Sequence, residues 1–251
     1  MKYFIIFFLA IQFLFGQSKM KPEETEVWEP EPKVVQPGVF LSPPSDAIIL
    51  FDGTDFSKWR SERTKGDVEW TLNPDKSMTV KPGKGGIETI DEHGSVQLHI
   101  EWKSPTVIKG EGQGRGNSGI FFQRRYEIQV LDSYQNRTYS NGQAGSIYKQ
   151  YIPLVNAMRP TGEWQVYDIV FNVPEFNDNG DEIKPGSFIV FHNGILIQNS
   201  VEIQGTTEYI GRPKKGRNVM PGFLGGDKRR SLMLQDHSDL VSYRNIWMRK
   251  L

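Results

Sequence analysis

One stretch, Tyr126–Asp132, combines side chains suited to acid–base chemistry with the alternation of a β-strand. In an extended strand, Glu127 and Gln129 project to one side, and Ile128 and Val130 project to the other. A carboxyl group can take or give a proton, and an amide can both donate and accept hydrogen bonds. We therefore predict a sheet with an apolar core side and a polar side that carries the function.

A second stretch, Leu232–His237, repeats this pattern. Its two leucines share one face, while Gln235 and His237 share the other with a methionine. We predict that this strand and Tyr126–Asp132 lie in one sheet and that their polar faces form a sugar site. Glu127 and His237 are the titratable residues on these faces, which makes them the candidate acid–base pair.

The rest of the chain indicates short strands separated by turns. Asn193-Gly194, between Ser187–His192 and Ile195–Asn199, is the strongest hairpin signal. No long stretch shows the periodicity of a helix. Short strands with regular turn signals predict an all-β fold, either an antiparallel sandwich or a barrel.

The composition agrees with a turn-rich β protein and excludes several kinds of site. The 251 residues include 25 glycines, 15 prolines and 12% aromatic residues. Lys+Arg and Asp+Glu both number 30, and a formal net charge of zero argues against a general nucleic-acid or membrane-surface role. The absence of cysteine excludes disulfides, thiolate metal sites, a cysteine nucleophile and a lipoprotein anchor.

The N-terminus indicates export. Lys2 is followed by an apolar run, Tyr3–Phe15, which is short for a membrane span and suits the apolar region of a signal peptide. We expect a signal peptide over residues 1–17, no stable membrane insertion after cleavage, and a periplasmic or secreted protein. The alternative is an uncleaved anchor helix.

A proline-rich segment separates the signal peptide from the folded domain. Residues 18–45 hold six prolines, each of which fixes its φ angle and lacks a backbone donor, so we predict an extended linker. The domain is predicted over residues 46–251. Near its end, the glycine-rich, basic segment 205–230 is either a solvated loop or part of the rim of a site.

Several familiar sites are missing from the sequence. It contains no phosphate-binding Walker loop and no G-x-S-x-G motif. The four histidines, at positions 93, 99, 192 and 237, show no tight spacing of metal ligands.

Seven motifs in order resemble one known family, the 3-keto-disaccharide hydrolase domain, long known only as a domain of unknown function. They are Leu50–Trp59 (LFDGTDFSKW), Gly116–Ser133 (GNSGIFFQRRYEIQVLDS), Gly145–Tyr148 (GSIY), Gly162–Trp164 (GEW), Asn193-Gly194, Leu234–His237 (LQDH) and Tyr243–Ile246 (YRNI). The similarity covers the chain from Ala47 to Leu251. It implies a concanavalin A-like jelly roll, in which two antiparallel sheets pack together and sugar lies on the concave face.

The resemblance also implies a substrate class: glycosides already oxidised to a ketone at C3, supplied by a sugar 3-dehydrogenase. The ketone acidifies the C2 proton, so a base can start an elimination at C1, and water then adds to the enone. Such a site needs a base, an acid and a donor to the enolate oxygen. A divalent metal is an alternative for this last task.

Residues are assigned to these tasks as follows. Glu127 and His237 are the catalytic acid and base, in either order. Arg125, which shares strand parity with Glu127 if no turn intervenes at 124–125, would stabilise the enolate. The substrate-binding candidates are Asn117 and Ser118 as donors to the ketone, Gln129 and Gln235 as hydroxyl ligands, and Trp164 as a stacking platform, although such tryptophans more often belong to a core.

Two other functions remain open. A retaining endoglucanase on this fold would resemble E-x-D-x-x-E, but Gln129 stands in place of the middle acid and Asp132 falls on the apolar parity unless a bulge intervenes. A non-catalytic carbohydrate-binding module is the other alternative, because a fold does not determine a function.

Overall fold

A computed structural model describes residues 20–40, 42–219 and 230–251. The chain divides into two units, Met1–Val35 and Gln36–Leu251. The described part of the first unit holds one 3₁₀ turn, η1 (Pro22–Thr25), and is otherwise without helix or strand. The predicted signal peptide, 1–17, lies outside the described residues. Within the described ranges, no helix has the length and apolarity to span a bilayer.

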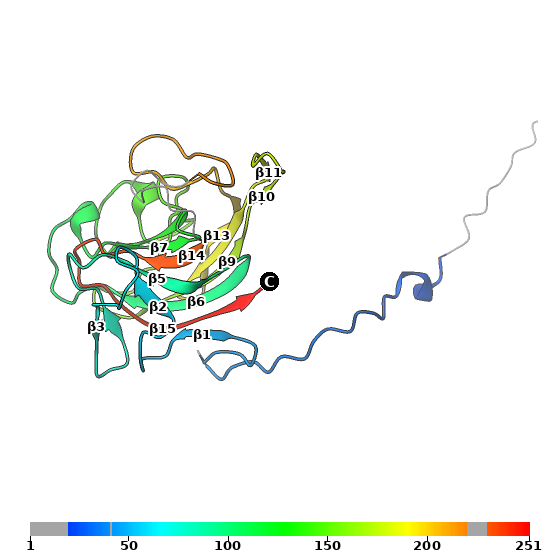
Figure 1. Ribbon diagram of the computed structural model, residues 1–251, viewed down its shortest axis with the longest axis horizontal. Coiled ribbons are helices and arrows are strands. Elements are labelled where there is room, and N and C mark those ends of the chain that lie inside the picture. The colour runs from blue at the N-terminus through cyan, green and yellow to red at the C-terminus, as the bar shows by residue number, and fades with distance from the viewer. Residues whose placement is uncertain (1–19, 41, 220–229) are drawn as a thin grey trace, which may run out of the picture. The chain divides into compact units, whose positions relative to one another are not determined.

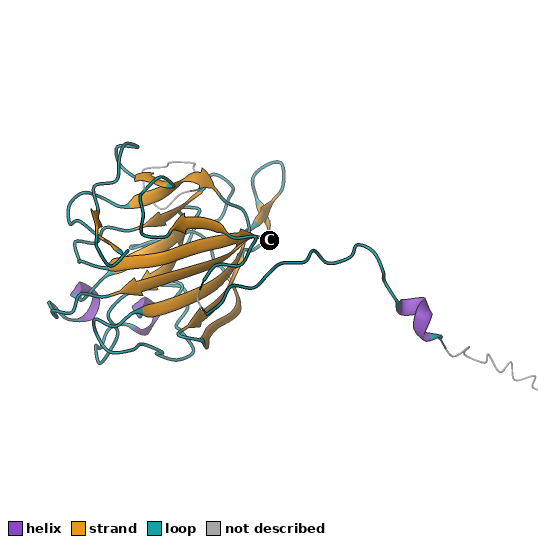
Figure 2. Cartoon of the chain, turned by 90° about the horizontal axis from the view of Figure 1, so that it is seen from below, coloured by secondary structure: helices purple, strands orange, loops and turns teal. Residues whose placement is uncertain are grey.

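The second unit is built from two antiparallel sheets (Figure 1). Its larger sheet is drawn broadside in Figure 2. In order, this sheet holds β13 (Ile195–Glu202), β12 (Ser187–His192), β9 (Gln165–Asn172), β6 (Val96–Lys103), β15 (Ser242–Lys250), β4 (Met78–Thr79) and β3 (Thr71–Leu72), with β1 (Ile48–Phe51) also paired to β15.

The smaller sheet carries the two strands with the polar alternation. Its order is β2 (Trp59–Ser61), β5 (Ile87–Glu92), β14 (Ser231–Leu234), β7 (Ser118–Phe122) and β8 (Tyr126–Val130). A separate two-stranded ribbon is formed by β10 (Glu175–Phe176) and β11 (Glu182–Lys184), and the described loops add two 3₁₀ turns, η2 (Gly112–Gly114) and η3 (Ser140–Gly142). Among the described residues there is no α-helix, and the predicted all-β sandwich is confirmed.

The core between the sheets explains which way the polar side chains face. Ile128 and Val130 are fully buried in it. Two tyrosines of the larger sheet reach across: the Tyr167 hydroxyl donates to the Gln129 carbonyl at 3.0 Å, and that of Tyr243 donates to Ser118 Oγ at 2.7 Å. Because the apolar side of β8 is committed to this core, its alternate residues must face away from the core.

Two hairpin turns have the same backbone geometry but different sequence signals. Asn193 and Gly194 have φ angles of 52° and 81°, so the predicted turn is confirmed. Gln123 and Arg124 have φ angles of 50° and 57°, although neither is glycine. Positive φ at both central residues matches the twist of a two-stranded hairpin. A turn therefore does intervene before β8, and Arg125 is not part of that strand.

Candidate active site

The polar face of the smaller sheet forms the floor of a cavity of about 570 Å³. β7 lies between β14 and β8 and connects the two strands singled out from the sequence. Five of the predicted site residues line this cavity: Asn117, Glu127, Gln129, Gln235 and His237. The volume falls in the range of ligand sites in proteins.

Glu127 is the buried carboxyl of this floor, with 4% of its surface exposed. Burial raises its pKa well above the ordinary value for glutamate. Its carboxylate lies directly over Gly119 of β7, where an added Cβ would approach Glu127 Oε1 to 2.4 Å. In the amide orientation that satisfies its hydrogen bonds, Gln129 donates to Glu127 Oε1 at 3.0 Å. The carboxyl group is thus held between a glycine and an amide.

Loop residues that were not predicted complete the walls. The Tyr139 and Tyr148 hydroxyls are 2.6 Å apart, and burial raises the pKa of both. The Lys149 ammonium donates to the Tyr209 carbonyl at 2.5 Å and lies 4.6 Å from the centre of that ring. Gln113 and Thr207 also line the cavity. In the sequence, Tyr148 belongs to a motif of the family resemblance, and the other five residues are marked only by their position in loops.

Arg125 lies outside the cavity, so its predicted place beside Glu127 is wrong. Its guanidinium donates from Nε to the Val219 carbonyl at 3.0 Å, and its own carbonyl accepts from the Thr207 amide at 2.7 Å. Thr207 Oγ1 in turn accepts from the Glu127 amide at 2.9 Å. Arg125 therefore anchors loop 205–219 to the sheet and places Thr207 in the wall.

Ser118 and Trp164 also fall outside the cavity. Ser118 shares the core side of β7, where its hydroxyl donates to the Gln235 carbonyl at 2.7 Å. Trp164 precedes β9 in the other sheet, and the centre of its ring is 4.7 Å from Lys103 Nζ and 4.0 Å from Arg244 Cζ. Neither side chain is placed to touch a ligand above Glu127.

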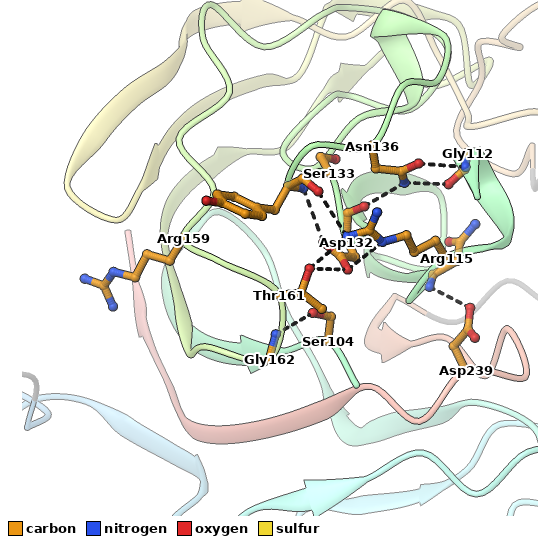
Figure 3. Close-up of polar contacts among 12 residues, drawn as sticks. Ser104, Gly112, Arg115, Asp132, Ser133, Asn136, Arg159, Thr161, Gly162 and Asp239 are labelled. Carbon is orange, nitrogen blue, oxygen red and sulfur yellow. Dashed lines mark hydrogen bonds and ion pairs between the residues drawn. The ribbon is translucent and has the colours of Figure 1, made fainter. Parts of the chain in front are cut away.

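Asp132 belongs to a different network (Figure 3). Its Oδ2 accepts from Arg115 Nε and from Thr161 Oγ1, both at 2.8 Å. It lines a second cavity, whereas Glu127 lines the first. The two carboxyl groups therefore do not face each other across one site, as a retaining glycosidase requires.

The described residues show no evident metal centre. No group of three or more histidine and acidic side chains converges as metal ligands within 20–40, 42–219 and 230–251. In the basic segment 205–230, residues 220–229 lie outside the described ranges. The described part contributes Thr207 and Tyr209 to the cavity.

The cavity brings together groups that can move protons and bind hydroxyls. A buried carboxyl lies on its floor, an exposed imidazole from His237 lies at its edge, and the phenols and the ammonium of Lys149 come from its walls. Four amide side chains supply further donors and acceptors, from Gln113, Asn117, Gln129 and Gln235. Such a set suits acid–base chemistry on a polyhydroxylated ligand.

Comparison with solved structures shows the same fold in related chains. A crystal structure from Parabacteroides distasonis ATCC 8503, described as a "putative glycosyl hydrolase", is 46% identical, with a TM-score of 0.85, and the match covers 94% of this chain and 99% of that one. A second structure with the same description, from the same organism, is 20% identical with a TM-score of 0.56, over 82% of this chain and 94% of that one, and shows the fold alone. No curated protein matches the chain.

A family model matches residues 46–249, almost the whole of the second unit. Its description is a 3-keto-alpha-glucoside-1,2-lyase-like domain. This match and the similar crystal structure confirm the resemblance found in the sequence motifs, and they identify a carbohydrate-active protein of a glycoside-cleaving family. The chain therefore belongs to the 3-keto-alpha-glucoside-1,2-lyase-like, or 3-keto-disaccharide hydrolase, domain family.

Proposed function

We propose that the protein cleaves glycosides whose C3 hydroxyl has been oxidised to a ketone. The observation that carries this proposal is the buried carboxyl of Glu127 on the floor of the sugar-sized cavity. The raised pKa makes the Glu127 carboxylate a stronger base than that of an exposed glutamate. A stronger base is needed to remove the C2 proton next to a ketone. The family's description as a 1,2-lyase supports elimination across C1 and C2.

In the proposed reaction, Glu127 takes the C2 proton and the electrons of the C2–H bond form an enolate towards C3. The enolate collapses, the C1–O bond breaks, and C1=C2 forms. His237, at the exposed edge, gives a proton to the departing oxygen. Water then adds its oxygen to C1 and a proton to C2, so the net result is hydrolysis.

The surrounding groups support binding and charge stabilisation. The hydroxyls of Tyr139 and Tyr148 and the ammonium of Lys149 are donors for the enolate oxygen, in the place first given to Arg125. Gln129 and Gln235 would hold sugar hydroxyls. The exposed ring of Tyr209 offers a flat face to the sugar.

The test is mass spectrometry of the whole chain acting on a 3-keto-glucoside and its unoxidised parent in D₂O, with and without EDTA. Cleavage of the keto form alone, with deuterium at C2 and loss of activity in Glu127→Gln, is expected. Glu202→Gln, at the exposed last residue of β13, is the matched control. Cleavage of the parent without deuterium at C2 would favour an ordinary glycosidase. Binding without turnover would favour a carbohydrate-binding module, and EDTA sensitivity would add a metal.

We also propose that the protein is exported and acts after a sugar 3-dehydrogenase. The apolar run Tyr3–Phe15 supports export, and a keto substrate requires an oxidation upstream. The mass of the chain recovered from a Gram-negative periplasm should show loss of residues 1–17. A full-length chain recovered with the membrane fraction would instead favour an anchor.

A further inference from the structure

A second cavity, of about 450 Å³, lies next to the Glu127 cavity. Consecutive residues line the two cavities, with Gly116 in the second and Asn117 in the first, and Ser238 in the second and His237 in the first. The backbone N–H of Asn117 donates to Asp239 Oδ2 at 2.7 Å and connects these two segments. The two cavities therefore share a wall that is a single chain segment thick at each of these points.

Arg115 brings an unused donor to this second cavity. Its Nε donates to Asp132, and its Nη2 donates to the Tyr134 carbonyl at 3.0 Å and to Thr161 Oγ1 at 2.8 Å (Figure 3). No residue in the described parts of the chain accepts from Nη1. The side chain is 12% exposed, and it lines the cavity. The guanidinium is thus held rigidly by three hydrogen bonds while one of its nitrogens remains available.

The charges around the cavity favour an anion. Lys103 and Lys109 line it, and neither forms an ion pair with a carboxylate that the structure describes. The two acids in the lining, Asp132 and Asp239, already accept hydrogen bonds from the protein. A planar guanidinium with its own position fixed binds carboxylates well.

The remaining lining combines four apolar residues with four hydroxyl side chains, of which Ser104 and Ser242 already form hydrogen bonds within the protein. Val107, Ile108 and Leu240 are 67%, 55% and 52% exposed, and Pro105 lies with them. Exposed apolar side chains gathered at one cavity mark a binding surface more often than a solvated one. Against these four residues an apolar ligand body gains from burial, whereas the hydroxyls of a sugar acid would lose hydration there.

We infer that this second cavity binds a small organic carboxylate with an apolar or aromatic body, with the carboxylate on Arg115. The acid comes either from the leaving group of the glycoside or from a separate molecule. The first source is considered because the cavities are neighbours: a leaving group joined to a sugar in the Glu127 cavity would have to reach over the shared wall. The inference does not depend on the proposed function, because binding of a free acid needs no turnover.

The test is a titration of the whole chain with benzoate and, separately, with benzyl alcohol as its neutral counterpart. Binding is measured by calorimetry and by ligand-observed NMR at low salt. Benzoate should bind at least tenfold more tightly than benzyl alcohol. Lys109→Gln should weaken benzoate about threefold, and Leu240→Ser should weaken both probes. Arg115→Lys should remove most of the preference for the anion, because lysine keeps the positive charge but lacks the planar pair of donors of the guanidinium.

The controls separate this site from its neighbour. Lys250→Gln, at the opposite end of β15 from Ser242, should leave benzoate binding unchanged, and so should Glu127→Gln. If Arg115→Lys fails to fold, Lys109→Gln and Leu240→Ser still decide, because neither residue takes part in the Asp132 network. Equal binding of both probes, or loss of benzoate binding in Glu127→Gln but not in Leu240→Ser, would overturn the inference.

A second arm identifies the source of the acid. The 3-keto-glucosides of phenol and of 4-hydroxybenzoate are compared as substrates. A higher kcat/KM for the carboxylated one that disappears in Lys109→Gln assigns the cavity to the leaving group. Equal values, with benzoate still bound by the free protein, assign it to a separate acid. If neither compound is cleaved while benzoate binds, the proposed function fails and the carboxylate site stands.

Discussion

Gly119 is the position where a single methyl group should separate activity from stability. In Gly119→Ala, the new Cβ would stand 2.4 Å from Glu127 Oε1 and 2.8 Å from Phe121 Cε2. Ordinary contact begins near 3.4 Å, so the carboxylate must retreat by about 1 Å. A displacement of about 1 Å can cost about 100-fold in rate, or ~2.7 kcal/mol in the barrier.

The stability of Gly119→Ala should change much less than its activity. Oε1 is the far end of a side chain that opens on a cavity, so it can move without unfolding the sheet. Overpacking costs about 1–3 kcal/mol, and removing a glycine from the unfolded chain offsets about 0.4–1 kcal/mol of that. We expect Tm to fall by no more than about 10 °C.

The assay is kcat/KM on a 3-keto-glucoside beside a thermal melt, with Gly94→Ala as the matched control. An added Cβ at Gly94 meets no atom within 4 Å, and this glycine has no left-handed φ, so its variant should behave as the parent. Activity in Gly119→Ala within threefold of the parent would refute the reasoning, because Glu127 would then not need its observed position.

Three further outcomes follow from the charges and the loop anchor. Because burial raises the pKa of Glu127 and its carboxylate is the active form, kcat/KM should rise with pH, with a midpoint well above pH 4.5. Glu127→Gln should lower kcat/KM by about 10³-fold or more. A Glu127→Gln enzyme with parental activity and no pH dependence would contradict this. Burial is the largest influence on the pKa of His99 and lowers it, but the hydrogen bonds and opposite charges of Asp168 and Glu101 together outweigh burial and raise the pKa from 6.5 to about 9. The protonated ring therefore contributes up to ~3 kcal/mol below pH 6.5, which is lost as the pH rises through 9; urea unfolding at pH 6, 7.5 and 9 should show this slope, and His99→Asn should not. Arg125→Ala should release loop 205–219 and lower Tm. It should raise KM about tenfold with a smaller change in kcat, because the loop supplies a wall of the cavity and not the base. If the loop is as well protected from proteolysis in the variant as in the parent, Arg125 does not anchor it.

The facing of Glu127 and Gln129 could be predicted because a strand has a period of two. Ile128 and Val130 must enter the core, and a shift of β8 by one residue would expose both of them to solvent. The same reasoning placed Gln235 beside Glu127 and Gln129, although β14 ends at Leu234 and Gln235 follows it, with its backbone amide donating to the Gly119 carbonyl of β7 at 3.0 Å. Local alternation was sufficient here because hydrophobic burial decides it.

The place of Arg125 could not be predicted by the same rule. Counting back from Glu127 assumes that the strand continues, but Gln123 and Arg124 turn with positive φ. Glycine or asparagine usually signals such a turn, and neither is present. The contacts of Arg125 with loop 205–219, far away in sequence, hold the arrangement.

By itself, the sequence determined the sandwich, the family and the polar floor of the cavity, since each depends on short-range patterns or on motifs in order. Only the tertiary structure decided the walls. Tyr139, Tyr148, Lys149 and Tyr209 come from loops, which have no period that would predict their direction. The same is true of Asp132, which lies with Arg115 because hydrogen bonds between three loops fix both side chains. Burial of apolar residues acts on neighbours along a strand, whereas the meeting of loops depends on the whole packed fold.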